Sequence, residues 1–156
     1  MKTGLSLMLL AEDNPADADL ILASLTKDGF AGAIQVVRDG VETLDFAFRR
    51  GEYANRDRDL CLRVIVLDVK LPKIDGFEVL RELKADPRTR SIPVVMLTSS
   101  NIDSDVARAY ELGANSYVQK PVDFEGFRRT VRDLGVYWMT TNEAGPAWPT
   151  APRLPK

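Results

Sequence analysis

Three carboxylates, one hydroxyl and one lysine each follow directly, or within a residue or two, a short apolar run of this 156-residue chain. They are, in chain order, Glu12, Asp13, Asp68, Thr98 and Lys120. If the apolar runs are parallel strands, these side chains gather at one edge of the sheet, because ligands of open α/β sheets bind outside the carboxyl ends of the strands. Three neighbouring carboxylates repel one another, and a hard cation such as Mg²⁺, which takes carboxylate oxygens and waters, would relieve that repulsion.

The same set of groups suits phosphoryl transfer, a reaction that depends on alignment and charge neutralisation. Lys120 supplies a cation, Thr98 supplies a hydroxyl, and a carboxylate can itself accept the phosphoryl group. The chain has no Gly-x-x-x-x-Gly-Lys loop, so ATP bound at this edge is not expected as the donor. It also has no histidine, which excludes Ser-His-Asp and Cys-His triads and imidazole zinc sites.

Short aliphatic runs predict the strands that position these residues. Almost uninterrupted apolar runs are typical of strands covered on both faces, as in a parallel sheet. Such runs occupy residues 5–10, 64–67 and 94–97. A shorter apolar run stands at 117–118, and residues 33–37 alternate as an edge strand does. Strands that alternate with helices predict a parallel sheet with right-handed crossovers and helices on both faces.

Five amphipathic stripes predict the helices. The stripes are Ala18, Ile21, Leu22 and Leu25; Val41, Leu44 and Phe48; Gly76, Val79, Leu80 and Leu83; Val106, Ala109, Tyr110 and Gly113; and Phe124, Phe127, Val131 and Leu134. Asn14 before Pro15 predicts an N-cap for the first helix. Asp75 with Glu78 resembles a capping box, and Asp123 can cap the last helix.

Composition predicts one globular domain at residues 1–140, followed by a proline-rich C-terminal extension at 141–156. A net charge of −2 provides no basic field for nucleic acid, so no nucleic-acid partner is expected. No apolar run approaches the roughly 18–20 residues of a membrane span, and no cleavage pattern follows the first apolar run, which predicts a cytoplasmic protein without membrane association. The single cysteine, Cys61, excludes an internal disulfide and a cysteine-based metal cluster.

A set of motifs, in chain order, resembles the receiver domain of two-component response regulators over roughly residues 4–136. They are Glu12-Asp13, Asp68 with Leu71-Pro72 and Asp75-Gly76, Thr98, and Lys120-Pro121. The resemblance implies a flavodoxin-like five-stranded parallel sheet of order 2-1-3-4-5 with five flanking helices. It also implies a phosphoacceptor signalling protein rather than an enzyme acting on a separate substrate. The donor histidine would belong to a partner kinase, which agrees with the absence of histidine here.

The resemblance assigns roles to individual residues. Asp68 accepts the phosphoryl group, while Lys120 and Thr98 neutralise its oxygens. Mg²⁺ is the implied metal and no organic cofactor is implied; its ligands are Asp13, Asp68 and the Lys70 backbone carbonyl, with Glu12 acting through a water. Family members carry a cis peptide bond at the position of Lys120 and Pro121.

Movement of Thr98 with Tyr117 is the implied switch that reshapes the face of the fourth helix and fifth strand. An ordinary packing role for Tyr117 is the alternative. Lys70 departs from the family, which often has asparagine there, so its ammonium either alters water access to the phosphoryl group or is simply solvated. Asp17 and Asp19 are expected to face solvent, because no calcium-loop pattern surrounds them.

Further phrases resemble the small stand-alone regulators that partner bacterial phytochrome kinases. They are Gly51-Glu52-Tyr53-Ala54, Leu71 to Gly76, Lys84 to Pro87, Ile92 to Val95, Leu97 to Ser100, and Tyr137-Trp138. The implied partner is a sensor histidine kinase, with a bacteriophytochrome as the specific candidate and a phosphotransfer protein as a further one. About twenty residues follow Val136, too few for a DNA-binding effector domain.

Large apolar residues beyond the last stripe predict a homodimer through the fourth helix, fifth strand, fifth helix and C-terminal extension. These residues are Tyr137, Trp138, Met139 and Trp148. The alternative is that Trp138 covers the core of its own chain.

Two other functions compete with the phosphoacceptor. An aspartate-nucleophile phosphatase places a second aspartate two residues after the first, where this chain has Lys70. A non-catalytic receiver that acts only as a scaffold would not need the full acidic set. A flavin-binding flavodoxin is excluded because its phosphate loop needs donors where this chain has Glu12 and Asp13.

Overall fold

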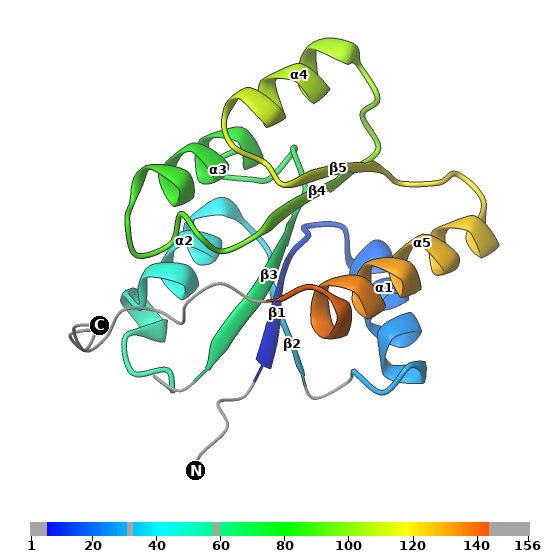
Figure 1. The fold of residues 1–156 in the computed structure, drawn as a ribbon, viewed down its shortest axis with the longest axis horizontal. Helices are drawn as coiled ribbons and strands as arrows, with labels where there is room; N and C mark the ends of the chain where they lie inside the picture. The colour runs from blue at the N-terminus through cyan, green and yellow to red at the C-terminus, as the bar shows by residue number, and fades with distance from the viewer. Residues whose placement is uncertain (1–5, 31–32, 58–59, 144–156) are drawn as a thin grey trace.

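The computed structural model describes residues 6–30, 33–57 and 60–143, and its centre is a five-stranded parallel sheet (Figure 1). The strands are β1 (Ser6–Ala11), β2 (Ile34–Val37), β3 (Cys61–Leu67), β4 (Val94–Thr98) and β5 (Ser116–Gln119). Their order across the sheet is β2-β1-β3-β4-β5, and each neighbouring pair is parallel. The predicted fold class and strand order are confirmed, and β3 begins three residues earlier than its apolar run.

Helices cover both faces of the sheet (Figure 1). They are α1 (Pro15–Lys27), α2 (Gly40–Phe48), α3 (Gly76–Ala85), α4 (Asp103–Glu111) and α5 (Phe124–Val136). A short 3₁₀ turn, η2 (Gly51–Tyr53), follows α2, and a π-helical segment, η3 (Tyr137–Thr141), extends α5; neither was predicted. Within the described residues, no helix is both long and apolar enough to cross a membrane.

The strands are buried on both faces because successive side chains point to opposite sides. On β1, Leu7 and Leu9 join the cluster under α2, α3 and α4, whereas Met8 and Leu10 join the cluster under α1 and α5. The apolar runs therefore serve two cores at once. This arrangement aligns the strands so that the residues after their carboxyl ends share one edge.

The predicted N-caps are confirmed. The acceptor side chains and the amides that donate to them are Asn14 with Asp17, Asp75 with Glu78, and Asp123 with Gly126. The capping box is only half formed, because the Glu78 carboxylate pairs with Arg81 within α3. Each cap starts its helix close to the edge where the polar residues gather.

Several members of the predicted apolar stripes do not join the core. Val41, Tyr110 and Phe124 are 38%, 51% and 59% exposed. Gly113 lies beyond the end of α4, with a left-handed φ of +104°. The 3.6-residue period identifies a helix, but how far the helix rotates against the sheet, and where it ends, depend on its packing partners.

The C-terminal segment packs on its own chain as far as the structure describes it. Trp138 packs partly buried against the α1–α5 core, and Met139 is buried there. Arg63 of β3 donates to the carbonyl oxygens of Trp138, at 3.3 Å, and of Asn142. These contacts favour the alternative in which Trp138 covers its own core, whereas Tyr137 is exposed. Trp148 lies outside the described residues.

The peptide bond between Lys120 and Pro121 is trans, as are the other described peptide bonds. The expected cis bond is therefore wrong for this structure. The trans form is favoured by about 0.5–1 kcal/mol for a bond that precedes proline, unless tertiary contacts select the cis form.

Candidate functional site

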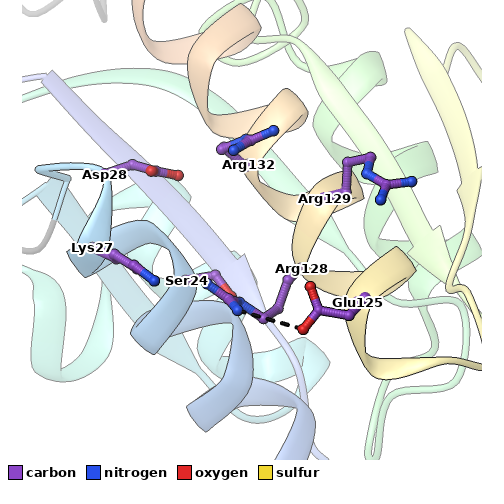
Figure 2. A pocket seen from close by; sticks show the side chains of 7 residues that line it. All are labelled: Ser24, Lys27, Asp28, Glu125, Arg128, Arg129 and Arg132. Carbon is purple, nitrogen blue, oxygen red and sulfur yellow. Dashed lines mark ion pairs between the residues drawn. The ribbon is translucent and has the colours of Figure 1, made fainter.

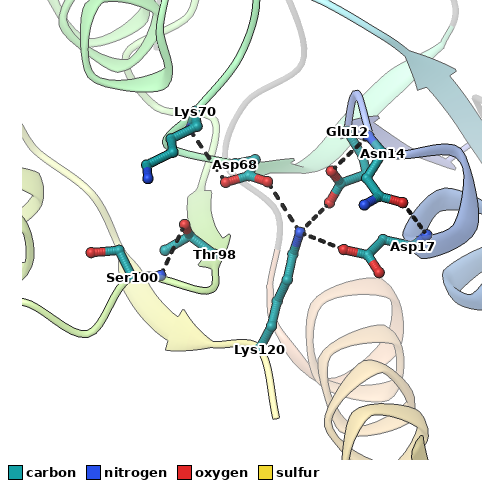
Figure 3. A network of polar contacts seen from close by, with 8 residues as sticks. All are labelled: Glu12, Asn14, Asp17, Asp68, Lys70, Thr98, Ser100 and Lys120. Carbon is teal, nitrogen blue, oxygen red and sulfur yellow. Dashed lines mark hydrogen bonds and ion pairs between the residues drawn. The ribbon is translucent and has the colours of Figure 1, made fainter. Parts of the chain in front are cut away.

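The lysine that follows β5 lies at the centre of the polar edge (Figure 3). Lys120 Nζ donates to Glu12 Oε1 at 2.6 Å and to Asp68 Oδ2 at 3.0 Å. Glu12 follows β1 and Asp68 follows β3, so the site joins three strands that are distant in the sequence. The sheet thus brings together the acidic and cationic groups that the strand ends predicted.

The three partners are buried, with 2% of Glu12, 8% of Asp68 and 8% of Lys120 exposed. Burial raises the pKa of Glu12 to about 7, although the hydrogen bond from Lys120 opposes the rise. Burial alone would lower the pKa of Lys120, but its bond to Glu12, the charge of Asp68 and a third carboxylate hold that pKa above its ordinary value. Lys120 is therefore positively charged at neutral pH.

The third carboxylate belongs to Asp17, and this position corrects the expectation that Asp17 faces solvent. Asp17 Oδ2 accepts a hydrogen bond from Lys120 Nζ at 3.0 Å. Asp17 stands in the first turn of α1, three residues after its cap Asn14, and helical side chains point back toward the helix N-terminus. The sequence shows that Asp17 stands in the first turn, but no local pattern shows that this turn faces Lys120.

A carboxylate cluster opens from this buried centre toward solvent. Glu12, Asp13 and Asp68 each offer an oxygen, and these oxygens lie within 4.8 Å of one another. Asp13 is exposed whereas the other two are buried. Hard oxygen donors at this spacing, with one open side for water, fit a divalent cation such as Mg²⁺ or Mn²⁺. Lys70 approaches through its backbone, where its amide donates to Asp68 Oδ1 at 3.3 Å, and its side chain is exposed.

The loop after β4 links the predicted switch residues through Ser100. Thr98 is buried, and its Oγ1 accepts a hydrogen bond from the Ser100 amide at 3.4 Å. The Tyr117 hydroxyl donates to the Ser100 carbonyl at 2.9 Å, and Ser100 Oγ donates to Asp105 of α4 at 2.7 Å. Burial raises the pKa of Tyr117, which keeps its hydroxyl protonated as a donor. Sequence reasoning missed Ser100 and Asp105, because a serine in a loop and an acid in a first turn carry no specific signal.

A close backbone contact holds the loop that carries Asp68. The Gly76 amide donates to the Val69 carbonyl at 2.7 Å, so the chain returns beside Asp68 before α3 begins. A Cβ atom at Gly76 would lie 2.0 Å from the Asp68 carbonyl oxygen. Only glycine leaves room for this approach.

Comparison with known proteins identifies relatives whose sequences align with most of this chain. The model of the response regulator receiver domain matches residues 8–132. The probable methanogenesis regulatory protein FilR2 of Methanothrix harundinacea is 44% identical over 142 residues, which cover 90% of this chain and 89% of that protein. Response regulator Rcp1 of Synechocystis is 37% identical over 134 residues, covering 86% of this chain and 89% of Rcp1.

Solved structures of response regulators also superpose on this chain. The Mn²⁺-bound form of Rcp1 superposes with a TM-score of 0.81 at 34% identity, covering 90% of this chain and 99% of that one. The phosphorylated cyanobacterial phytochrome response regulator RcpA superposes with a TM-score of 0.83 at 35% identity, covering 92% and 99%. Phosphorylation and divalent-metal binding are typical of such signalling proteins. The chain therefore belongs to the response regulator receiver domain family.

Proposed function

We propose that this protein is the Mg²⁺-dependent phosphoacceptor of a two-component phosphorelay, in which Asp68 takes a phosphoryl group from a phosphohistidine of a sensor kinase. An Asp68 oxygen bonds to phosphorus as the phosphorus–nitrogen bond breaks, and the imidazole leaves with the electron pair of that bond. The observation that supports this most directly is the contact of Asp68 with Lys120 at the end of the central strand. A phytochrome kinase is the specific partner we propose, because similar solved structures include the phytochrome response regulator RcpA and the bacteriophytochrome response regulator RtBRR; a phosphotransfer protein is a second candidate.

The neighbouring groups would neutralise the phosphoryl oxygens. Lys120 supplies a fixed positive charge, and Thr98 supplies a hydroxyl that can donate once it turns from the Ser100 amide. When bound, Mg²⁺ would add positive charge on the open side of the site. Its proposed holders are Glu12, Asp13, Asp68 and the Lys70 backbone carbonyl.

The proposed response passes through Ser100. When Thr98 Oγ1 turns to the phosphoryl group it leaves the Ser100 amide, and the Ser100 carbonyl is the acceptor of Tyr117. The loop before α4 is then free to shift with Tyr117, which changes the α4–β5 face. Hydrolysis of the aspartyl phosphate would end the response, and we infer that the exposed Lys70 side chain alters water access to the phosphoryl group.

Incubation with acetyl phosphate and Mg²⁺, followed by intact mass measurement, tests the proposal. A single phosphoryl adduct is the expected product. A receiver that acts only as a scaffold would acquire none. An aspartate-nucleophile phosphatase is disfavoured by the chain itself, since Lys70 stands where its acid would be.

Neutralising the exposed member of the carboxylate cluster tests the metal. We expect Asp13→Asn to weaken Mg²⁺ binding at least about tenfold, the scale on which loss of even an outer partner acts. The metal-free fold should be as stable as wild type or more so, because one repelling carboxylate is removed. Thermal melts with and without MgCl₂ measure both effects, since a ligand that binds only the folded state raises the melting temperature. Asp19→Asn, an exposed acid of α1 outside the cluster, is the matched control, and a wild-type Mg²⁺ response from Asp13→Asn would contradict the site.

We also propose that the receiver domain at residues 1–140, together with the extension at 141–156, forms a homodimer through α4, β5 and α5. The β5 strand ends the sheet, and a groove of about 440 Å³ lies between it and α5. Exposed apolar residues lie on these helices or next to their ends, namely Ile102, Tyr110, Val136 and Tyr137. Such residues are typical of a surface that a partner covers.

Sedimentation of the full-length chain and of a chain that ends at Val136 tests this dimer. We expect the full-length protein to sediment as a dimer and the shortened chain to dissociate at several-fold higher concentration. A full-length protein that stays monomeric at high micromolar concentration, phosphorylated or not, would remove the dimer.

A further inference from the structure

A polar groove of about 250 Å³ lies between α1 and α5, on the face of the sheet opposite α2 and α3 (Figure 2). Its charged lining consists of Lys27, Arg128, Arg129 and Arg132 against Asp28 and Glu125. Four cations against two carboxylates give this groove a net charge of +2, whereas the whole chain carries −2. Positive charge is therefore concentrated on one surface of an otherwise acidic protein.

Most of this positive charge is available to a partner. Arg128 extends from α5 toward α1 and pairs with Glu125, with Nη1 3.7 Å from Oε1 (Figure 2). Within residues 6–30, 33–57 and 60–143, no carboxylate pairs with Lys27, Arg129 or Arg132, and all three are exposed. Internal ion pairs thus leave three of the four cations uncompensated.

Two exposed apolar side chains lie next to one end of the groove. Phe124 is exposed at the start of α5, and the Arg128 guanidinium lies 5.9 Å from the centre of its ring. Val122, two residues earlier, is fully exposed. Arginine beside an exposed aromatic ring is the composition found at protein–protein interfaces, where such residues carry much of the binding energy.

The groove is lined by both cations and carboxylates, and this combination favours one class of partner over another. Asp28 and Glu125 would repel a uniformly anionic ligand such as a polyphosphate. Such a ligand also has no apolar group that could pack against Phe124 and Val122. A protein segment can offer carboxylates and apolar side chains together. A surface groove between two packed helices can also receive a third helix, whose side-chain ridges fit between theirs.

We propose that this groove docks an acidic helical segment of a protein partner. The carboxylates of that segment lie against Lys27, Arg129 and Arg132, and one of its apolar side chains covers Phe124 and Val122. Because the cations are exposed, binding is steered by charge and weakens as salt rises. The proposal concerns a surface outside the phosphoryl-transfer site and does not depend on phosphorylation of Asp68.

A synthetic helical peptide of about 16 residues serves as the probe, with glutamates along one face and a leucine near one end. A fluorescent label on the peptide reports its binding to the full-length protein by anisotropy at low salt. The key variant is Arg132→Glu, and the matched control is Arg90→Glu, an exposed arginine between α3 and β4. We expect Arg132→Glu to weaken binding about tenfold, or ~1.4 kcal/mol, and Arg90→Glu to change it less than twofold. Phe124→Ala should weaken binding severalfold at any salt concentration.

Four results would overturn the proposal. The first is no binding of the glutamate peptide up to millimolar concentration, and the second is equal binding of a peptide with glutamine in place of glutamate. The third is an equal effect of Arg132→Glu and Arg90→Glu. The fourth is full displacement by inorganic pyrophosphate without any effect of Phe124→Ala, which would identify a site for small oxyanions. Phosphorylation by acetyl phosphate should be wild-type in Arg132→Glu, so this proposal and the phosphoacceptor function can fail separately.

Discussion

Asp68→Ala is expected to reduce phosphate incorporation from acetyl phosphate to background. Glu12 also contacts Lys120, but it is the poorer acceptor, because burial raises its pKa to about 7 and because only 2% of it is exposed, against 8% of Asp68. Asp13 is exposed and has no hydrogen bond to Lys120 among those described. Asp68 alone in the cluster combines contact with Lys120 and a position at the end of the central strand.

Intact mass after incubation with acetyl phosphate and Mg²⁺ measures this loss. Asp19→Ala, which removes an exposed α1 carboxylate, should retain the adduct of the wild-type protein. Lys120→Ala should still accept phosphate, although more slowly, but should lose the change in the α4–β5 face, because the fixed charge that orients the phosphoryl oxygens is gone. Wild-type incorporation by Asp68→Ala would refute the assignment of the acceptor.

Gly76→Ala is expected to destabilise the fold by about 3 kcal/mol, the upper end of the usual cost of overpacking. Its Cβ would lie 2.0 Å from the Asp68 carbonyl oxygen and 2.9 Å from the Val69 Cα atom. Both are backbone atoms, so relief requires the whole loop to move. For a chain of this size the melting temperature should fall by about 9 °C.

Gly126→Ala is the matched control for this effect. There the nearest atom to a new Cβ is Asp123 Oδ1 at 2.7 Å, a side-chain atom that can rotate away. The loss of the cap is offset in part by the better helix propensity of alanine, so we expect a change within about 1 kcal/mol. Equal melting-temperature losses in the two variants would show that the contact with the Asp68 backbone is not what makes Gly76 necessary.

Local patterns in the sequence were sufficient for the alternation of parallel strands and helices, whereas the strand order was expected from the resemblance to receiver domains. Strand and helix periods differ, so nearly uninterrupted apolar runs and 3.6-residue stripes predicted the elements and their alternation. The caps at Asn14, Asp75 and Asp123 were also predictable, because a cap forms between residues three apart. Once the strands are parallel, the residues after them must meet at one edge. For this reason Asp68 and Lys120, 52 residues apart, could be expected together.

Tertiary packing set the features that no local pattern contains. Asp17 meets Lys120 across 103 residues, and this contact depends on how α1 is rotated against the sheet. The same freedom of rotation explains why Phe124, although part of a predicted stripe, is exposed beside a basic groove. A helical period specifies which residues share a face but not where that face points. The direction in which a helix face points is the one that buries the most apolar surface, and that amount depends on all the elements packed around the helix.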